Sequence, residues 1–130
     1  MILVDSSVWI TAFREPNSEV FRQLERIIEE RACTCGIVIQ EVLQGLHDPH
    51  VLWELDMRMS LLDCLETTRE TYRKAADLFR RCRRRGIAVH TVDALIMAIA
   101  IEHRVPAFTL DGDFVRAASV EKGLKLYAPK

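Results

Sequence analysis

Short apolar runs alternate with amphipathic segments along this chain, which predicts strands and helices in turn. The runs expected to form buried strands are 2–4, 32–35, 61–65, 106–110 and 124–127. Helices are predicted from residue 17 or 18 to about 31, 36 or 37 to about 46, 49 onward, 67 or 68 to 86, 92 to 103, and briefly from 113. This order predicts an α/β fold with a mostly parallel central sheet flanked by helices on both faces.

The helix predicted to end at Gly86 has the most explicit signals. Thr67-Thr68-Arg69-Glu70 has the pattern of a capping box, and Gly86 is the expected C-terminal cap. One apolar face of this helix is expected to pack on the core. This face is formed by Tyr72, Ala75, Ala76, Phe79 and Cys82. The basic run 80–85 is then expected to lie on the solvated face of the same helix.

Carboxylates stand at the ends of several apolar runs. Asp5 closes the first run, Glu41 follows 36–40, Asp93 opens 94–100, and Asp111 and Asp113 follow 107–110. An unpaired carboxylate is costly to bury, and the reactive edge of a parallel sheet lies at the carboxyl ends of its strands. We therefore expect these acids to gather in one place. A divalent cation with oxygen ligands, Mg²⁺ or Mn²⁺, is the natural partner for such a cluster.

Composition narrows the class of protein. A formal net charge of −1 excludes a general coat for polyanions, but it permits an enzyme that meets nucleic acid at a local site. The first apolar run has no basic segment before it, and the longest one, 94–101, is too short to cross a bilayer. These features predict a cytoplasmic protein without membrane association. Its four cysteines are expected to be reduced and core-lining, and its four histidines to lie at the surface or core boundary.

Four motifs around these acids, taken together and in this order, resemble the signature of the PIN-domain nucleases. They are Val4-Asp5-Ser6-Ser7-Val8-Trp9-Ile10, Gln40-Glu41-Val42-Leu43-Gln44-Gly45-Leu46, Thr91-Val92-Asp93-Ala94-Leu95-Ile96-Met97-Ala98 and Thr109-Leu110-Asp111-Gly112-Asp113-Phe114. More narrowly, the chain resembles the VapC-type toxins of bacterial and archaeal toxin–antitoxin pairs. The resemblance covers essentially the whole chain and implies a single PIN domain over residues 1–130.

The resemblance implies an Mg²⁺- or Mn²⁺-dependent endoribonuclease that hydrolyses RNA phosphodiester bonds. It also implies a homodimer, inhibited by a cognate VapB-type antitoxin. The positions that match the family's metal-site acids are Asp5, Glu41, Asp93 and, for the fourth acid, Asp111 or Asp113. Asp111 is expected to bind directly and Asp113 through water. Ser7 and Thr109 match supporting hydroxyl positions, and Arg14 and Arg116 are weaker candidates for positioning RNA.

Two alternatives remain open at this point. A phosphatase of the haloacid-dehalogenase type also opens with an apolar strand that ends in Asp, but its chemistry needs a second Asp two residues later, where Ser7 stands. The other alternative is a catalytically inactive PIN scaffold, against which the presence of every expected acid argues. A calcium loop at Asp111-Gly112-Asp113 is excluded, because Lys122 stands where the bidentate acid is required.

Overall fold

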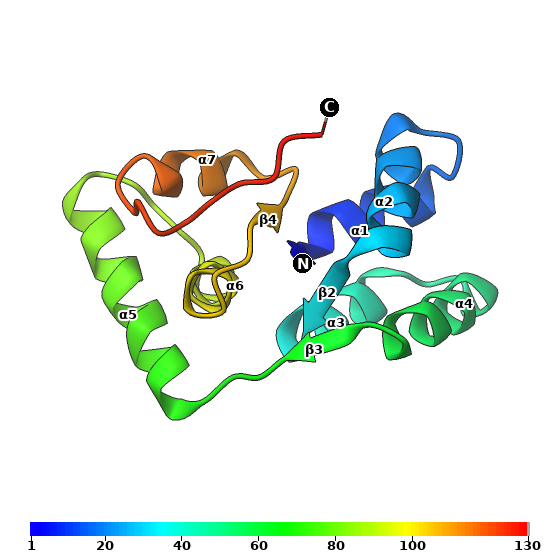
Figure 1. The fold of residues 1–130 in the computed structure, drawn as a ribbon, viewed down its shortest axis with the longest axis horizontal. Helices are drawn as coiled ribbons and strands as arrows, with labels where there is room; N and C mark the ends of the chain where they lie inside the picture. Colours follow the sequence, from blue (N-terminus) through cyan, green and yellow to red (C-terminus); the bar gives the residue numbers. More distant parts are fainter. Residues whose placement is uncertain (130) are drawn as a thin grey trace.

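The computed structural model describes residues 1–129 and contains a sheet of four parallel strands with seven helices around it (Figure 1). The strands are β1 (Ile2–Val4), β2 (Ala32–Cys35), β3 (Asp63–Leu65) and β4 (Ala107–Phe108). Their order in the sheet is β3-β2-β1-β4, so β1 lies between β2 and β4. The predicted α/β fold with a parallel sheet is confirmed.

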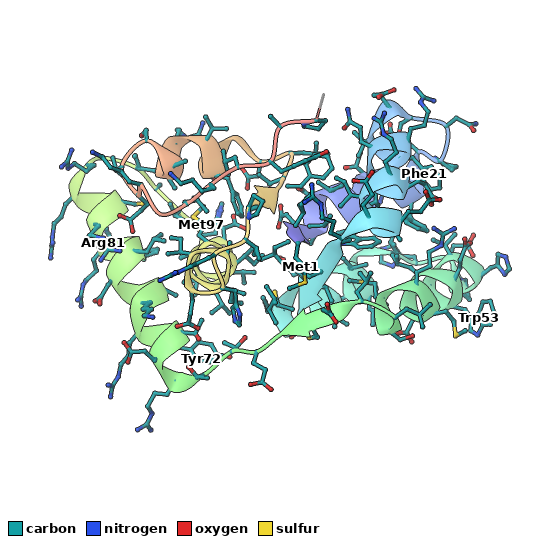
Figure 2. The ribbon with its side chains drawn as sticks, viewed as in Figure 1. Met1, Phe21, Trp53, Tyr72, Arg81 and Met97 are labelled. Carbon is teal, nitrogen blue, oxygen red and sulfur yellow. The ribbon has the colours of Figure 1, made fainter. Side chains whose placement is uncertain are left out.

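The helices divide into two groups along the molecule (Figure 1). They are α1 (Ser6–Arg14), α2 (Glu19–Glu30), α3 (Gly36–Gly45), α4 (Pro49–Ser60), α5 (Arg69–Arg84), α6 (Thr91–Glu102) and α7 (Gly112–Ala118). Helix α1 packs against α2 and α3, whereas α5 packs along α6. Figure 2 shows Trp53 on α4 and Arg81 on α5 near opposite ends of the molecule.

Helix α1 is the element that sequence reasoning missed. Its segment contains Val8, Trp9, Ile10 and Thr11, residue types with only moderate helix propensity. The helix forms because Val8 and Trp9 are fully buried in the core, and tertiary burial outweighs local propensity. The consequence is that Asp5, which ends β1, also occupies the N-cap position of a helix.

The apolar face predicted for α5 is confirmed at Ala75 and Cys82 but is wrong at Tyr72 and Ala76. Thr68 is the N-cap and forms a reciprocal capping box with Thr71, one residue later than predicted. The buried positions are Thr71, Ala75, Leu78 and Cys82. Tyr72 is 57% exposed, and Ala76 is also exposed. Tyr72 therefore faces outward, whereas Phe79 is half-buried and packs against the core. The basic run 80–85 is solvent-exposed as predicted, apart from the buried Cys82.

Three smaller expectations also differ from the structure. Residues 124–127 do not form a strand, because their only pairing with the sheet among the described residues is one bridge between Ala107 and Leu126. Cys64 is exposed, whereas the other three cysteines are buried. The strands β3 and β4 are shorter than predicted. Within residues 1–129, no helix is both long and apolar enough to cross a membrane.

Candidate functional site

The candidate site begins at the carboxyl end of β1. From β1 the chain continues to β2, which pairs along one edge of β1, and it returns much later as β4, which pairs along the other edge. The site therefore lies at a topological switch point. Asp5 follows β1 directly, and its backbone N–H donates to the Phe108 carbonyl of β4 at 2.8 Å. Although Asp5 is only 2% exposed, its side chain forms no capping hydrogen bond to α1.

Two hydroxyl groups hold the Asp5 carboxylate instead. Ser7 Oγ and Thr109 Oγ1 donate to Asp5 Oδ2 at 2.7 and 2.8 Å. Each hydroxyl has one proton, so its oxygen can also accept a hydrogen bond. Ser7 Oγ accepts from the Leu110 N–H at 3.1 Å, and Thr109 Oγ1 accepts from the Asp111 N–H at 3.0 Å. Ser7 and Thr109 therefore connect Asp5 to the turn between β4 and α7.

The other Asp5 oxygen, Oδ1, is buried and has no hydrogen-bond partner among the described residues. A buried carboxylate oxygen without a partner is costly, typically by a few kcal/mol. Such an atom indicates a missing ligand that is positively charged or can donate a proton. A divalent cation meets this requirement.

Two further acids, from α3 and α6, approach Asp5. Glu41 Oε1 accepts a hydrogen bond from Ser6 Oγ at 2.9 Å. Burial raises the pKa of Glu41, and the charge of Asp5 adds to this while the Ser6 bond opposes it. Burial also raises the pKa of Asp93 to about 7, together with the negative charges of Asp5, Asp111 and Glu41, against the opposing influence of His90. Acids from distant parts of the chain are thus close enough to affect one another's protonation.

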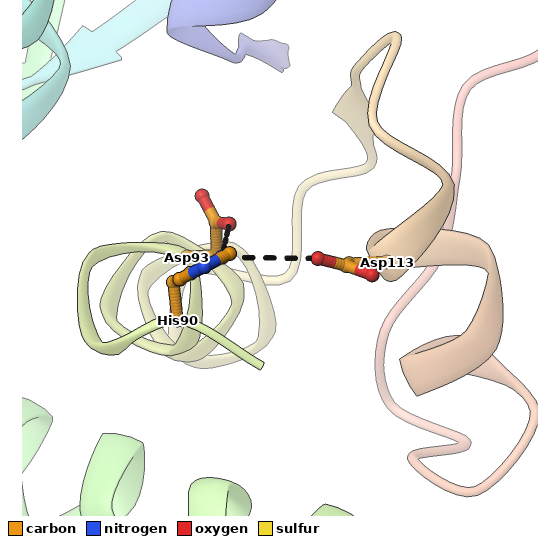
Figure 3. A group of neighbouring side chains, drawn as sticks. All are labelled: His90, Asp93 and Asp113. Atoms are coloured by element: carbon orange, nitrogen blue, oxygen red, sulfur yellow. Dashed lines mark ion pairs between the residues drawn. The ribbon is translucent and has the colours of Figure 1, made fainter. Parts of the chain in front are cut away.

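The two acids after β4 have different local roles. Asp111 is the N-cap of α7, and its Oδ1 accepts from the Asp113 N–H at 2.9 Å. Asp113 Oδ1 forms an ion pair with Arg116, while Oδ2 lies 3.9 Å from His90 Nδ1. The His90 Nδ1 atom is also 3.7 Å from Asp93 Oδ2 (Figure 3). We refer to Asp5, Glu41, Asp93, Asp111 and Asp113 together as the acid cluster.

Sequence reasoning missed two residues near the acid cluster. Ser6 contacts Glu41 because α1 begins directly after Asp5, and that helix was not predicted. His90 was expected to be a surface or boundary histidine and is exposed, but it faces Asp93 and Asp113. The sequence signal for this contact was the spacing of three residues between His90 and Asp93, because residues three apart lie side by side on a helix surface. His90 is the N-cap of α6.

The two arginines predicted to position RNA have protein partners. Arg14 Nη2 donates to the Gly45 carbonyl at 2.8 Å, at the C-terminal end of α3. Arg116 pairs with Asp113. Arg14 thus stabilises the junction between α1 and α3, and Arg116 neutralises and orients one member of the acid cluster.

The chemistry of the cluster fits a hard divalent cation. Its donors are carboxylate oxygens, two of its acids have raised pKa values, and one buried Asp5 oxygen has no protein partner within the described chain. Mg²⁺ and Mn²⁺ are bound by such oxygen donors, often with retained waters. The residues present therefore fit a metal-assisted hydrolytic site.

Comparison with known proteins assigns the family. Residues 2–120 match the PIN domain family. The chain is 32% identical over 119 residues to the VapC ribonuclease Mb1587 of Mycobacterium bovis, covering 88% of this chain and 89% of the relative. The ribonuclease VapC11 of Mycobacterium tuberculosis has the same identity and coverage.

The fold also resembles solved toxin–antitoxin structures. One is VapBC2 from Rickettsia felis bound to a promoter DNA fragment, with a TM-score of 0.79, 19% identity and 98% coverage of both chains. Another is VapC20 of Mycobacterium tuberculosis, a toxin that cleaves the sarcin–ricin loop, with a TM-score of 0.66, 19% identity and coverage of 90% of this chain and 95% of that one. The acid motifs, the parallel sheet and these matches agree, and the chain belongs to the PIN-domain family, as a relative of the VapC ribonucleases.

Proposed function

We propose that this protein is the endoribonuclease toxin of a type II toxin–antitoxin system and that it requires Mg²⁺ or Mn²⁺. The observation that carries the proposal is the gathering of the acid cluster at the switch point of a PIN fold. The relatives named VapC ribonucleases support RNA as the substrate class. The match over residues 2–120 supports a single PIN domain for residues 1–130.

Asp5, Glu41, Asp93 and Asp113 are the residues that would hold the metal. When bound, a divalent cation supplies activation of a water and neutralisation of charge on the scissile phosphate. The roles of the protein groups follow from their contacts. Ser7 and Thr109 fix Asp5 Oδ2 and leave Oδ1 free to act as a ligand, while Ser6 orients Glu41.

Arg116 and Asp111 act on the position of Asp113. The Arg116 guanidinium neutralises Oδ1 of Asp113, and the Asp111 carboxylate fixes the Asp113 N–H as part of the α7 cap. Asp113 Oδ2 is thereby directed toward His90 and Asp93. This geometry favours Asp113 over Asp111 as the direct fourth ligand, the reverse of the order expected from the sequence.

Cleavage of a stem-loop RNA tests the proposed function. We expect purified protein to cut single-stranded or loop RNA in Mg²⁺ or Mn²⁺, because such regions are accessible to sequence-reading side chains. Excess EDTA is expected to remove the activity, and restored metal to return it. Undiminished cleavage in EDTA would contradict the metal mechanism. Phosphate-monoester hydrolysis is the control for phosphatase chemistry, and none is expected.

The relatives also support a partner. The similar solved structures include VapBC complexes from Rickettsia felis and Salmonella typhimurium. A VapB-type antitoxin is accordingly the protein partner we propose for this chain. Because an inhibitor must block access to the reacting phosphate, co-expression of that antitoxin is expected to suppress RNA cleavage.

We further propose that the protein forms a homodimer through the groove between α5 and α6. This groove has a volume of about 380 Å³ and is lined mainly by apolar residues, including Tyr72, Ala76, Phe79, Val92 and Leu95. Exposed apolar surface of this kind favours association. Thr91 also lines the groove, so a second copy bound there would extend to the N-terminal end of α6.

Tyr72→Glu is expected to convert the dimer to a monomer, because it places a charge in the lining of the apolar groove. The residue is 57% exposed, so the fold should tolerate the change. Sedimentation equilibrium measures the result. Met57→Glu on α4, at a position 53% exposed, is the matched control and should leave the dimer intact. A dimeric Tyr72→Glu variant would place the interface elsewhere.

A further inference from the structure

His90 approaches two members of the acid cluster through one atom. Its Nδ1 lies 3.7 Å from Asp93 Oδ2 and 3.9 Å from Asp113 Oδ2, and one ligand atom from each residue lies within 4.8 Å of the others (Figure 3). These separations are too long for hydrogen bonds. Neighbouring ligands around an octahedral ion with bonds of 2.0–2.1 Å are about 3 Å apart. The three atoms can therefore reach one ion through small side-chain movements.

The backbone holds these three residues in place. His90 is the N-cap of α6, and its carbonyl accepts from the Ala94 N–H at 2.9 Å. Asp93 lies in the first turn of the same helix. Asp113 comes from the first turn of α7, and its pairing with Arg116 occupies Oδ1 and leaves Oδ2 facing the imidazole.

A second observation indicates a ligand at the same cluster. Asp5 is 2% exposed, its Oδ1 has no partner in the described part of the chain, and its charge acts on Asp93. This buried oxygen is separate in sequence from His90, Asp93 and Asp113. Because the charge of Asp5 acts on Asp93, a cation bound beside Asp93 would also be attracted to the Asp5 carboxylate.

We propose that His90 Nδ1 is a nitrogen ligand to the divalent metal bound by Asp93 and Asp113, and that it makes the site prefer Mn²⁺ to Mg²⁺. Imidazole nitrogen binds transition metals well, whereas Mg²⁺ favours hard oxygen ligands and retained water. The carboxylates provide charge for either ion. The imidazole is the one donor in this group that distinguishes between them. The inference rests on the proposed metal site.

A competing role for His90 predicts the opposite result. If a protonated His90 acted only as a positive countercharge to the acids, it would repel any cation. Its removal would then raise the affinity for Mn²⁺ and Mg²⁺ to a similar extent. If His90 is a ligand, its removal lowers the affinity for Mn²⁺ and affects Mg²⁺ much less.

The test compares wild type with His90→Ala, and with His50→Ala as a control exposed on α4. Titration calorimetry should show a Mn²⁺ affinity lowered about 10- to 100-fold in His90→Ala, the range typical of disturbed metal sites, and a much smaller change for Mg²⁺. Pulsed electron paramagnetic resonance of bound Mn²⁺ should show coupling to an imidazole nitrogen in wild type and His50→Ala, and none in His90→Ala.

The outcomes separate this inference from the proposed function. The His90 side chain is 84% exposed, so equal melting temperatures without metal are expected for wild type and His90→Ala. Unchanged Mn²⁺ affinity, or equal gains for both ions, would overturn the role of His90 and leave the carboxylate site standing. Failure of every variant, including wild type, to bind either ion would overturn the proposed metal-dependent function itself.

Discussion

Asp93→Asn is expected to lower metal-dependent RNA cleavage by about a thousandfold or more while the protein remains folded. Asn is nearly isosteric with Asp but has no negative charge for a cation, and metal-assisted catalysis contributes several kcal/mol to stabilising the transition state. Expression of wild type alone is expected to arrest growth, and expression of this variant is not. A variant as toxic as wild type would remove Asp93 from the metal site.

The same substitution is expected to stabilise the metal-free protein at neutral pH. The folded pKa of Asp93 is raised from 3.8 to about 7, so the folded state binds more protons than the unfolded state between these values. The stability of wild type therefore falls, relative to that of Asp93→Asn, as the pH rises from about 4 to above 7. At pH 8 the difference should be about 2 to 4 kcal/mol.

Urea unfolding in EDTA at pH 5 and pH 8 measures this difference. Asp56→Asn, an exposed position on α4, is the control and should follow the wild-type pH dependence. A constant difference between Asp93→Asn and wild type at both pH values would show that Asp93 is ionised in both conditions. Protons also compete with the metal for this carboxylate, so Mn²⁺ affinity should weaken as the pH falls below about 7.

The second large effect concerns the two acids that follow β4. At a Mn²⁺ concentration 100 times the dissociation constant, binding should add about 2.7 kcal/mol to wild-type stability, which corresponds to a rise of roughly 10 °C in melting temperature. Asp113→Asn is expected to remove most of this rise, because Asp113 Oδ2 faces His90 and Asp93. Asp111→Asn should retain most of the metal-induced rise in melting temperature.

The Asp111 variant provides a matched comparison. Asn is as good an N-cap as Asp, so Asp111→Asn should preserve the cap of α7 and its metal-free stability. Melting curves of both variants with and without Mn²⁺ are the measurement. A full metal-induced rise in Asp113→Asn, with a lost rise in Asp111→Asn, would restore the order expected from the sequence.

The sequence predicted that these acids would come together because the signals for this are local. Asp5, Glu41 and Asp93 each stand beside an apolar run, and parallel strands place their carboxyl ends at one edge. The outward rotation of Tyr72 was not predictable from spacing alone, because two overlapping apolar stripes run along α5. Tertiary packing, which buries Leu78 and leaves Tyr72 exposed, selected between them.

The finer chemistry depends on contacts that periodicity does not encode. Asp111 and Asp113 are equivalent candidates in a motif, and only the α7 cap and the pairing with Arg116 distinguish them. His90 lacks metal-ligand spacing in the sequence because its partner Asp113 comes from another helix. Helix α1 and the Ser6–Glu41 contact could be predicted only with the knowledge that Val8 and Trp9 are buried.

The hydrogen bond from Thr109 to Asp5 spans 104 residues, and this separation governs when activity can first arise during synthesis. Asp5 emerges from the ribosome early, but its carboxylate is oriented only after β4 has paired with β1. Contacts this distant in sequence form late, because the intervening chain must first be made and folded. A nascent or prematurely terminated chain that lacks β4 also lacks Thr109, Asp111 and Asp113, so its acid cluster is incomplete and Asp5 is missing one of its two orienting hydroxyl groups.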